Sequence, residues 1–258
     1  MSRPLPLSLL GVSMSPRLLG GALALALLAH AGVVQAKPAG GAAGPQILNP
    51  IAIDPLRLLP PFPVDGSATQ AEELAELRRL QATRTPAEFE RAKWNAEHED
   101  ATAFASAMGP KFDLAKLPAT ARLLQDVRAE QAAISKRAKS EFHRTRPWVA
   151  DPAIVGCPHG GDKGKSAYPS GHSTLGYTLA VVMADLAPEQ AQSVLARAAD
   201  YAHDRLVCGA HYRSDVVAGQ AMGVAIGVEL LRAPALKPEL DAARRELATA
   251  GVTQAPSP

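Results

Sequence analysis

Apolar residues recur every three or four positions along most of the chain after residue 66. Leu74, Leu77 and Leu80 are three apart and predict a helix over Thr69–Ala82. A second stripe predicts a helix over Pro118–Phe142, with charged residues off the stripe. The apolar positions of this second stripe are Leu124, Val127, Ile134 and Ala138. Both patterns indicate helices that pack one face against a core.

Residues that start and end helices place the other predicted helices. Thr85 stands before Pro86, with Glu88 in the next turn, which is typical of a helix N-terminus. That helix is expected to run to about Met108, because Gly109-Pro110 ends it. The remaining predicted helices run from within Pro169-Ser170-Gly171-His172 to Ala187, from Pro188 to about Arg205, from His211 to Leu231, and from Pro238 to Ala250 before Gly251.

No segment alternates apolar and polar residues with the period of two that a half-buried strand requires. Alanine is abundant and β-branched residues are few in the periodic segments. We therefore predict an all-α fold, with a single helical domain over residues 67–250. Residues 37–66 are rich in Pro, Gly and Ala and are expected to form an extended N-terminal arm, and residues 251–258 a loose tail.

Residues 1–36 have the features of a secretory signal peptide. Arg3 and Arg17 supply a positive n-region, Leu18–Leu28 is apolar, and Val34-Gln35-Ala36 provides a cleavage site. We expect cleavage near Ala36 and a periplasmic or secreted protein. An uncleaved membrane anchor is the alternative.

The charge of the mature chain argues against two kinds of partner. The signal segment holds two of the 27 Lys and Arg residues and no acidic residue, so the mature chain has 25 basic and 25 acidic residues. The pI of 8.6 therefore overstates its basicity. The chain contains no run of basic residues of the kind that binds nucleic acid. Outside the signal segment, no stretch approaches the roughly 20 apolar residues of a membrane span. We expect no nucleic-acid partner and no membrane span in the mature chain.

The two cysteines, Cys157 and Cys208, lie on either side of the second of three motifs described next. Because export favours oxidation, we predict a disulfide that ties the loops around the candidate site together. In the chain-entropy model, closing a loop of this length contributes about 4 kcal/mol. Two separate buried thiols are the alternative.

The first motif is Lys139 followed by Arg146-Pro147. The planar guanidinium of arginine can bind two phosphate oxygens, and lysine adds a point charge. The two basic residues are two helical turns apart, so they can share a face up to the helix end. Pro147 disfavours helical dihedrals at Arg146, which we therefore expect on the turn. Alone, each residue would be interpreted as an ordinary solvated side chain.

The second motif, Pro169-Ser170-Gly171-His172, is typical of a loop that enters a helix. Backbone N–H groups at a helix N-terminus bind anions. Gly171 lets the backbone approach a phosphate closely, and Ser170 adds a hydroxyl donor. His172 is then well placed to protonate a leaving oxygen.

The third motif consists of Arg205, His211 and Asp215. His211 and Asp215 are four apart at a predicted helix start, so they share a face. A carboxylate bonded to one imidazole nitrogen fixes the tautomer and leaves the other nitrogen free to attack phosphorus. Arg205 is expected in the loop upstream. His-x-x-x-Asp can also bind zinc, but three neighbouring cations would repel a divalent metal, so we predict no metal and no cofactor.

In this order and spacing, the three motifs resemble the signature of the phosphatidic acid phosphatase type 2 superfamily. Within it, the chain is similar to the bacterial class A nonspecific acid phosphatases. The supporting segments are Leu58-Leu59-Pro60-Pro61, Tyr168 before Pro169, and Val207–Tyr212 before Ser214-Asp215. The similarity covers roughly residues 58–231.

The resemblance implies an all-helical, exported, metal-independent acid phosphatase. Such an enzyme is a phosphoric monoester hydrolase of broad specificity that acts through a phosphohistidine. By position, it implies His211 as the nucleophile, Asp215 as its orienting carboxylate and His172 as the general acid. The phosphate-binding residues that it implies are Lys139, Arg146, Ser170, Gly171 and Arg205. The expected partners are small phosphate monoesters: nucleotides, sugar phosphates and aryl phosphates.

Two positions depart from the family's pattern. Asp204 stands before Arg205 where serine or glycine is usual, and Ala167 precedes Tyr168 where serine is common. Asp204 either pairs with Arg205 and weakens phosphate binding, or points away from it.

Three other functions share these motifs. A vanadium-dependent haloperoxidase-like enzyme uses a similar pocket to hold vanadate, although the known scaffolds are much longer. A lipid phosphatase has less support, because membrane helices are not predicted. A non-catalytic phosphate-binding module would follow if Asp204 spoils the site. The apolar helical faces and the arm also allow a homodimer.

Overall fold

The computed structural model describes residues 47–49, 52–158 and 161–254, and every regular element in these ranges is helical. The predicted all-α fold is therefore confirmed. The α-helices are α1 (Pro55–Leu58), α2 (Ala68–Thr83), α3 (Pro86–Glu97), α4 (Ala105–Met108), α5 (Pro118–Phe142), α6 (Pro147–Ala150), α7 (Gly171–Leu186), α8 (Ala191–Val207), α9 (Arg213–Arg232) and α10 (Lys237–Ala250). The 3-10 helices are η1 (Ala101–Phe104), η2 (Pro188–Gln190) and η3 (Pro234–Leu236). The predicted signal peptide and its cleavage site lie outside the described residues.

The helices begin and end where local side-chain chemistry directs. Thr85 and Glu88 form a reciprocal capping box at the start of α3, which confirms the start predicted from these residues. Ser67 caps α2 by accepting a hydrogen bond from the backbone N–H of Gln70 at 3.2 Å. Gly251 ends α10 with a φ of 68°, a left-handed conformation that glycine adopts without steric cost.

One predicted helix is interrupted. The sequence pattern predicts a single helix from Thr85 to about Met108, whereas α3 ends at Glu97 and η1 and α4 follow it. The side chain of Asp100 accepts a hydrogen bond from the backbone N–H of Thr102 at 2.8 Å, and this local cap begins a new turn. The break leaves Glu99 in the connection, where it lines the cavity described below.

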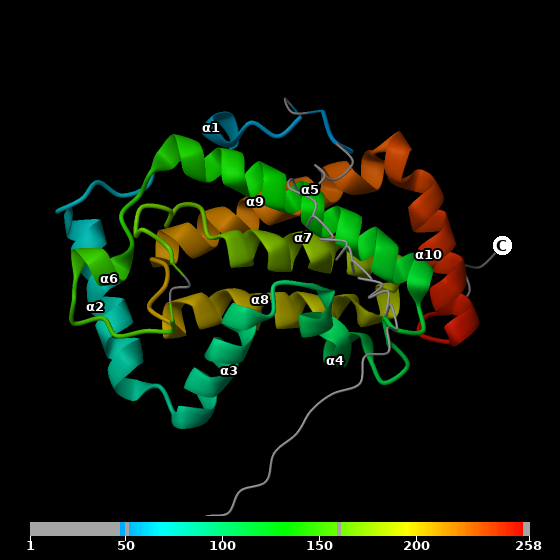
Figure 1. Ribbon diagram of the computed structural model, residues 1–258, viewed down its shortest axis with the longest axis horizontal. Coiled ribbons are helices and arrows are strands. Elements are labelled where there is room, and N and C mark those ends of the chain that lie inside the picture. The colour runs from blue at the N-terminus through cyan, green and yellow to red at the C-terminus, as the bar shows by residue number, and fades with distance from the viewer. Residues whose placement is uncertain (1–46, 50–51, 159–160, 255–258) are drawn as a thin grey trace, which may run out of the picture. The chain divides into compact units, whose positions relative to one another are not determined.

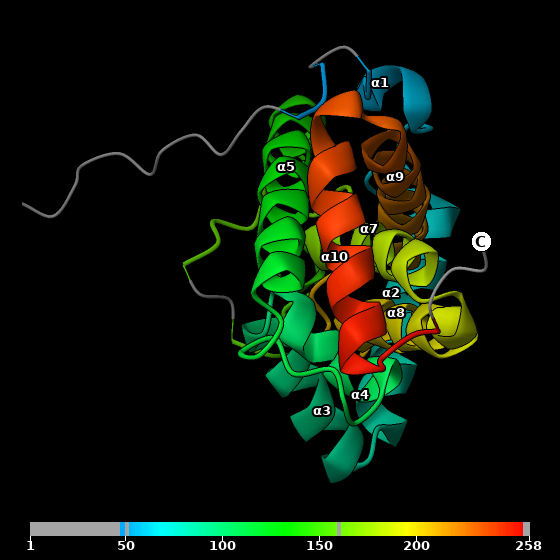
Figure 2. The same ribbon diagram turned by 90° about the vertical axis from the view of Figure 1, so that its right-hand side faces the viewer.

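Helix α7 lies at the centre of the bundle and contacts α5, α8 and α9 (Figures 1 and 2). Its approach to α9 is close because Gly219, Gly223 and Gly227 present no side chains on the facing stripe. A Cβ atom added at Gly219 would lie 2.5 Å from the carbonyl oxygen of Ser170, and one at Gly223 would lie 2.5 Å from that of Thr174. The stripe therefore keeps the N-terminal end of α7 beside that of α9, which brings the second and third motifs together.

Helix α9 is also long and apolar enough to cross a membrane, which the prediction of no span did not anticipate. It is the one helix of the described residues with these properties. Half of its most apolar window is buried inside the domain. Because core helices commonly meet the same criteria, its packing against α7 accounts for its composition.

Helix α3 is held against α8 by Asp204, one of the two residues that depart from the family's pattern. The buried carboxylate accepts hydrogen bonds from Arg91 Nε at 3.1 Å, Arg91 Nη2 at 2.9 Å and Asn95 Nδ2 at 2.5 Å. It points toward α3, so hydrogen bonding to Arg205 is not its role. Asp204 thus anchors the helix whose C-terminal end forms one wall of the site.

We expect Asp204→Ala to lower the free energy of unfolding by about 2 kcal/mol, because it leaves buried Asn95 and the Arg91 guanidinium without their charged acceptor. Urea unfolding followed by circular dichroism measures this change. Asp200→Ala is the matched control, because Asp200 is an exposed carboxylate one turn earlier on α8. It should change the stability by less than about 0.5 kcal/mol. Equal effects of the two substitutions would contradict the anchoring role.

Candidate active site

Four helix ends meet around one polar cavity. The C-terminal ends of α5 and α8 and the N-terminal ends of α7 and α9 lie at the same end of the bundle, on the left in Figure 1. The cavity has a volume of about 310 Å³ and is lined by residues from all three sequence motifs. Its ionisable lining residues are Glu99, Lys139, Arg146, Asp162, His172, Arg205 and His211.

Each of the three cations reaches the cavity from a different element. Lys139 is in the last turn of α5, and Arg146 is the N-cap of α6 with φ −72° and ψ 152°, so it lies on a turn as Pro147 predicts. Arg205 lies in the last turn of α8. The expectation that Arg205 is in a loop was wrong, because the first helix-breaking residue downstream is Gly209, whose φ is 60°.

Arg146 makes the most contacts in the cavity. Its Nη1 donates to the carbonyl oxygen of Ala210 at 2.8 Å and to His211 Nε2 at 2.7 Å. Its Nη2 donates to Asp162 Oδ2 at 2.6 Å and to Ser166 Oγ at 3.1 Å. Burial raises the pKa of Asp162, but Arg146 and nearby hydrogen bonds outweigh burial and hold the pKa below its usual value. Asp162 is therefore a carboxylate that orients Arg146 beside the nucleophile candidate.

The contacts of His211 favour one tautomer. Arg146 Nη1 lies 2.7 Å from His211 Nε2 and 3.2 Å from Nδ1. A guanidinium can only donate hydrogen bonds, so the shorter contact favours a lone pair on Nε2. The ring proton is then on Nδ1, which lies 3.4 Å from Asp215 Oδ2. This is the tautomer in which Nε2 can act as a nucleophile.

Asp215 and Ser170 lie behind the cavity wall. Asp215 Oδ2 accepts a hydrogen bond from the backbone N–H of Tyr212 at 2.8 Å, and burial raises the pKa of Asp215 to about 6. Ser170 is the N-cap of α7, which begins within Pro169–His172 as predicted, and its Oγ accepts hydrogen bonds from the backbone and the hydroxyl of Ser173. Ser170 is fully buried and is not among the residues that line the cavity, so its role as a phosphate donor stays a prediction. The backbone N–H of Ser170 donates to the carbonyl oxygen of Asp215 at 3.0 Å, which links the two motifs directly.

His172 lies on the wall opposite the third motif's loop, against the end of α3. Its Nε2 is 3.2 Å from the carbonyl oxygen of Ala96 and 3.4 Å from Glu99 Oε1. Because a carbonyl only accepts, Nε2 carries a proton in the neutral ring. Nδ1 is then the nitrogen that is free to gain and lose a second proton.

Burial depresses the pKa values of the basic groups. It is the main reason that the pKa of Lys139 falls to about 8 and that of Arg205 to about 10, and the charge of Arg146 adds to both effects. Burial and the neighbouring cations also lower the pKa values of His172 and His211 well below the ordinary value. A bound anion would raise all of these pKa values, so the cluster is poised for a negatively charged ligand.

Two guanidinium donors in the cluster are buried and unsatisfied. Within the described residues, Nε of Arg146 and Nε of Arg205 have no hydrogen-bond partner. Gly171 adds space, since a Cβ atom there would lie 3.5 Å from Lys139 Nζ. Unsatisfied buried donors cost free energy, which an anion in the cavity would recover.

The predicted disulfide is present. Cys157 and Cys208 are bonded, and the described residues contain no free cysteine. The backbone N–H of Cys157 also donates to the carbonyl oxygen of Cys208 at 3.1 Å. The bond joins the loop before the second motif to the loop that carries His211.

Sequence reasoning missed four residues around the site: Glu73, Glu99, Arg144 and Asp162. Arg144 lies two positions before Arg146. Its position in the sequence does not reveal that its side chain turns away from the cavity. The acidic residues come from three separate segments, and no spacing rule connects them to the motifs. Asp162 lies in the glycine-rich segment before the second motif, which is the one local signal that a sequence analysis offers.

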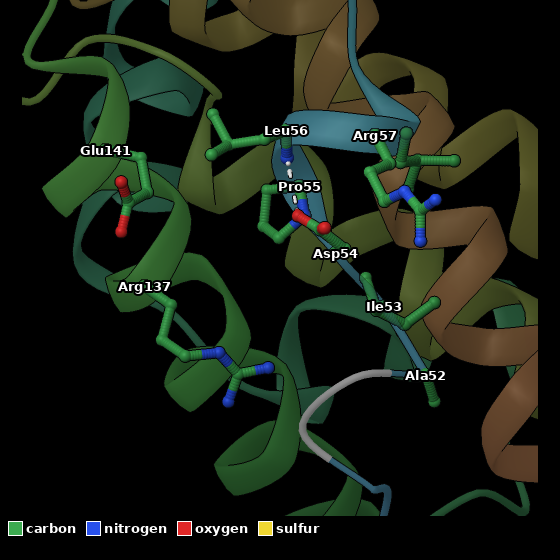
Figure 3. A pocket seen from close by; sticks show the side chains of 9 residues that line it. Ala52, Ile53, Asp54, Pro55, Leu56, Arg57, Arg137 and Glu141 are labelled. Carbon is green, nitrogen blue, oxygen red and sulfur yellow. Dashed lines mark hydrogen bonds between the residues drawn. The ribbon is translucent and has the colours of Figure 1, made fainter.

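A larger hollow lies elsewhere. It has a volume of about 720 Å³ between the segment of α1 and the C-terminal part of α5, where Arg137 and Glu141 line it (Figure 3). None of the motif residues line this hollow. The motif residues therefore gather at the smaller cavity, which is the candidate site.

The described residues contain no group of three or more His, Cys, Asp or Glu side chains placed to hold a metal ion. His211 and Asp215, the pair with zinc-ligand spacing, face each other, and Arg146 Nη1 contacts both ring nitrogens of His211, with the shorter contact to Nε2.

Comparison with known proteins agrees with the geometry. The PAP2 superfamily model matches residues 128–237, which contain all three motifs. The chain is 31% identical to an acid phosphatase from Zymomonas mobilis over 200 residues, which cover 75% of each chain. It is 29% identical to a non-specific acid phosphatase from Providencia stuartii over 78% of this chain and 83% of that one.

Among solved structures, a transmembrane PAP2-type phosphatidylglycerolphosphate phosphatase from Bacillus subtilis overlaps loosely. Its TM-score is 0.48 at 16% identity, over 64% of this chain and 85% of that chain. The sequence similarity is the stronger finding. The match to the Zymomonas mobilis acid phosphatase extends over three quarters of both proteins, and the residues that the family model matches include every motif residue. The chain therefore belongs to the PAP2 superfamily, among its acid phosphatases.

Proposed function

We propose that this acid phosphatase hydrolyses phosphate monoesters of broad specificity through a phosphohistidine on His211, without a metal ion. The observation that carries the proposal is that His211 lines one cavity with three cations, with Arg146 Nη1 2.7 Å from its Nε2 and Asp215 Oδ2 3.4 Å from its Nδ1. A phosphate monoester at neutral pH supplies the negative charge and the acceptor oxygens that complement such a cluster of cations.

Substrate binding begins with the phosphate group. Lys139, Arg146 and Arg205 neutralise its charge, and the unsatisfied Nε donors of the two arginines become partnered. The N-terminal end of α7, at Gly171, adds backbone donors and a favourable helix dipole. Binding draws Arg146 Nη1 away from His211 and onto a phosphate oxygen, which exposes the nucleophile.

In the first chemical step, Nε2 of His211 attacks phosphorus as the ester P–O bond breaks. Asp215 stabilises the positive charge that develops on the ring. His172 gives a proton to the leaving oxygen, so an alcohol departs. In the second step, His172 takes a proton from water, the water oxygen bonds to phosphorus, and the N–P bond breaks to release inorganic phosphate.

The low pKa of His172 requires that the substrate help to supply the proton. Phosphate monoesters have a second pKa near 6, so the monoanion is abundant in mild acid. A monoanion that enters the cationic cavity can pass its proton to His172 and become the dianion. The general acid is thereby charged at the moment when the phosphate is bound.

The leaving-group side of the cavity favours broad specificity. Its outer wall includes Ala96, Trp148 and Pro158, with Glu99 as the polar group beside His172. Few directional contacts are available to the alcohol, so we expect nucleotides, sugar phosphates and aryl phosphates as substrates.

The homodimer allowed by the sequence stays a prediction.

We also propose that the protein is exported to the periplasm or secreted. The disulfide supports this location, because such bonds persist in oxidising compartments. The predicted signal segment ends at Ala36, before the first described residue.

His211→Ala should lower kcat at least about 10⁴-fold and abolish the phosphoenzyme, because the attacking nitrogen is lost. His172→Ala should still form a phosphoenzyme with p-nitrophenyl phosphate, whose leaving group needs little protonation, but should hydrolyse it slowly. Rapid-quench labelling with ³²P-labelled substrate measures both. His203→Ala is the control, since His203 is on α8 but does not line the cavity. Labelling that persists in His211→Ala would refute the assigned nucleophile.

The pH profile of kcat/KM should peak close to pH 6. Activity rises with pH as Asp215 loses its proton, since the pKa of this group is about 6. It falls at higher pH as the substrate monoanion disappears, also near pH 6. Profiles for an aryl and an alkyl phosphate should differ in the basic limb according to each ester's second pKa. An identical basic limb near pH 8 for both esters would instead assign it to Lys139.

Activity should survive prolonged treatment with excess chelator, because a cavity that holds three cations disfavours a divalent metal. The assay is p-nitrophenyl phosphate hydrolysis before and after dialysis against EDTA, with metal content checked by mass spectrometry. Loss of activity that zinc restores would overturn the metal-free mechanism and support the zinc interpretation of His211 and Asp215.

A further inference from the structure

Arg144 is a buried charge that the mechanism above does not use. It follows α5 and lies two positions before Arg146, but its side chain is fully buried and does not line the cavity. Its Nη1 is 2.5 Å from Asp215 Oδ1, and its Nη2 is 2.9 Å from Glu73 Oε2. One guanidinium therefore joins two buried carboxylates, one of which faces the nucleophile.

The surroundings hold the guanidinium in this orientation. The ring of Tyr212 lies 3.9 Å below it, and the ring of Phe62, from the N-terminal arm, lies 5.4 Å away. Nη1 also donates to Ser214 Oγ at 2.7 Å. A buried Arg with charged, hydroxyl and aromatic partners on several sides keeps one position, so Asp215 Oδ1 has a fixed charged donor.

Glu73 connects the same system to the first turn of α9. Its Oε1 accepts a hydrogen bond from the backbone N–H of Ser214 at 2.6 Å, next to Asp215 in the chain. Its Oε2 takes the second arm of Arg144. Glu73 comes from α2, which is far from the motifs in sequence but reaches them through these bonds.

We propose that Arg144 and Glu73 form a positioning pair that turns the Asp215 carboxylate toward Nδ1 of His211 and, by opposing effects, sets how readily it ionises. The proposal rests on the proposed function of His211 as nucleophile. Arg144 occupies Oδ1 and so leaves Oδ2 for the Tyr212 N–H and His211. Glu73 shares the charge of Arg144, which limits how strongly Arg144 stabilises the Asp215 carboxylate.

The other charged or titratable groups that face Asp215 are Arg146, Tyr168, Tyr212 and His211. Arg146 is a cation, and burial raises the pKa values of Tyr168 and Tyr212 to about 12, so both phenols stay neutral. Burial lowers the pKa of His211 well below its ordinary value. Arg144 is the largest influence that opposes the effect of burial on the pKa of Asp215. The pair therefore controls the ionisation of the carboxylate.

Substitutions of the two members should shift the acid limb of the pH profile in opposite directions. Arg144→Met removes the cation, so the acid limb of the kcat profile should move up by about one pH unit or more. At pH 6, kcat should fall about fivefold or more, because a one-unit rise from a pKa of about 6 lowers the ionised fraction of Asp215 by this factor. KM should change less than about twofold, because Arg144 does not line the cavity. Glu73→Gln removes the competing carboxylate, so the acid limb should move to lower pH.

Glu76→Gln is the matched control. Glu76 is also on α2 and also pairs with α9, through Arg213, but that ion pair is at the surface and does not touch Asp215. It should leave the acid limb in place. Arg144→Lys keeps the positive charge but loses the two-armed guanidinium. Its acid limb should therefore lie between those of the wild-type chain and Arg144→Met.

The measurement is kcat and KM for p-nitrophenyl phosphate from pH 4 to 8 on the full mature chain, with folding checked by circular dichroism. Acid limbs that do not move, or that move in the same direction in Arg144→Met and Glu73→Gln, would overturn the positioning role. If Arg144→Met does not fold, the direction in Glu73→Gln decides alone. Absence of a phosphoenzyme in the wild-type chain would instead refute the proposed function itself.

Discussion

Positive charge held out of water is the constraint on which this site depends. Lys139, Arg146 and Arg205 share a cavity of about 310 Å³ with His172 and His211. Burial lowers every one of their pKa values, and the charges of neighbouring cations add to this effect at Lys139, Arg205 and both histidines. The cluster holds together because carboxylates lie within and behind it, and because the chain around it is firmly packed. Each supporting feature of the fold helps to offset the free-energy cost of burying these positive charges together.

The supporting features position the helix ends that surround the cavity. The glycine stripe on α9 lets α7 approach closely, so two helix N-termini face the same space. The disulfide joins the loops on either side, and Asp204 holds α3 against α8 as a wall beside His172. Cations then enter from the C-terminal ends of α5 and α8, where long side chains can reach past the last turn.

The sequence predicted the elements that depend on local order and missed those that depend on partners. Helical periodicity and caps such as Thr85 with Glu88 are local, and the structure confirms them. The break after α3 was missed because Asp100 looks like an ordinary charged residue in a helical pattern. Arg205 was misplaced because nothing before Gly209 marks the true end of α8.

The same distinction applies to the site. Motif spacing found Lys139, Arg146 and Arg205 because each comes from a recurrent signature, and it found His172 and His211 for the same reason. Arg144 could not be found in this way, since its partners Glu73 and Asp215 are 71 positions away on either side. A buried charge owes its role to the tertiary structure around it, which a single sequence does not display.

The contact between Arg146 and His211 Nε2 is one of several that satisfy the buried guanidinium. Arg146 also donates to Asp162, Ser166 and the Ala210 carbonyl. A phosphate offers better acceptors than a neutral ring, because its oxygens carry the charge. In the proposed mechanism, the phosphate that binds Arg146 therefore also releases His211 Nε2 for attack. The same anion raises the pKa of His172, which favours the protonated form that the proposed general acid requires.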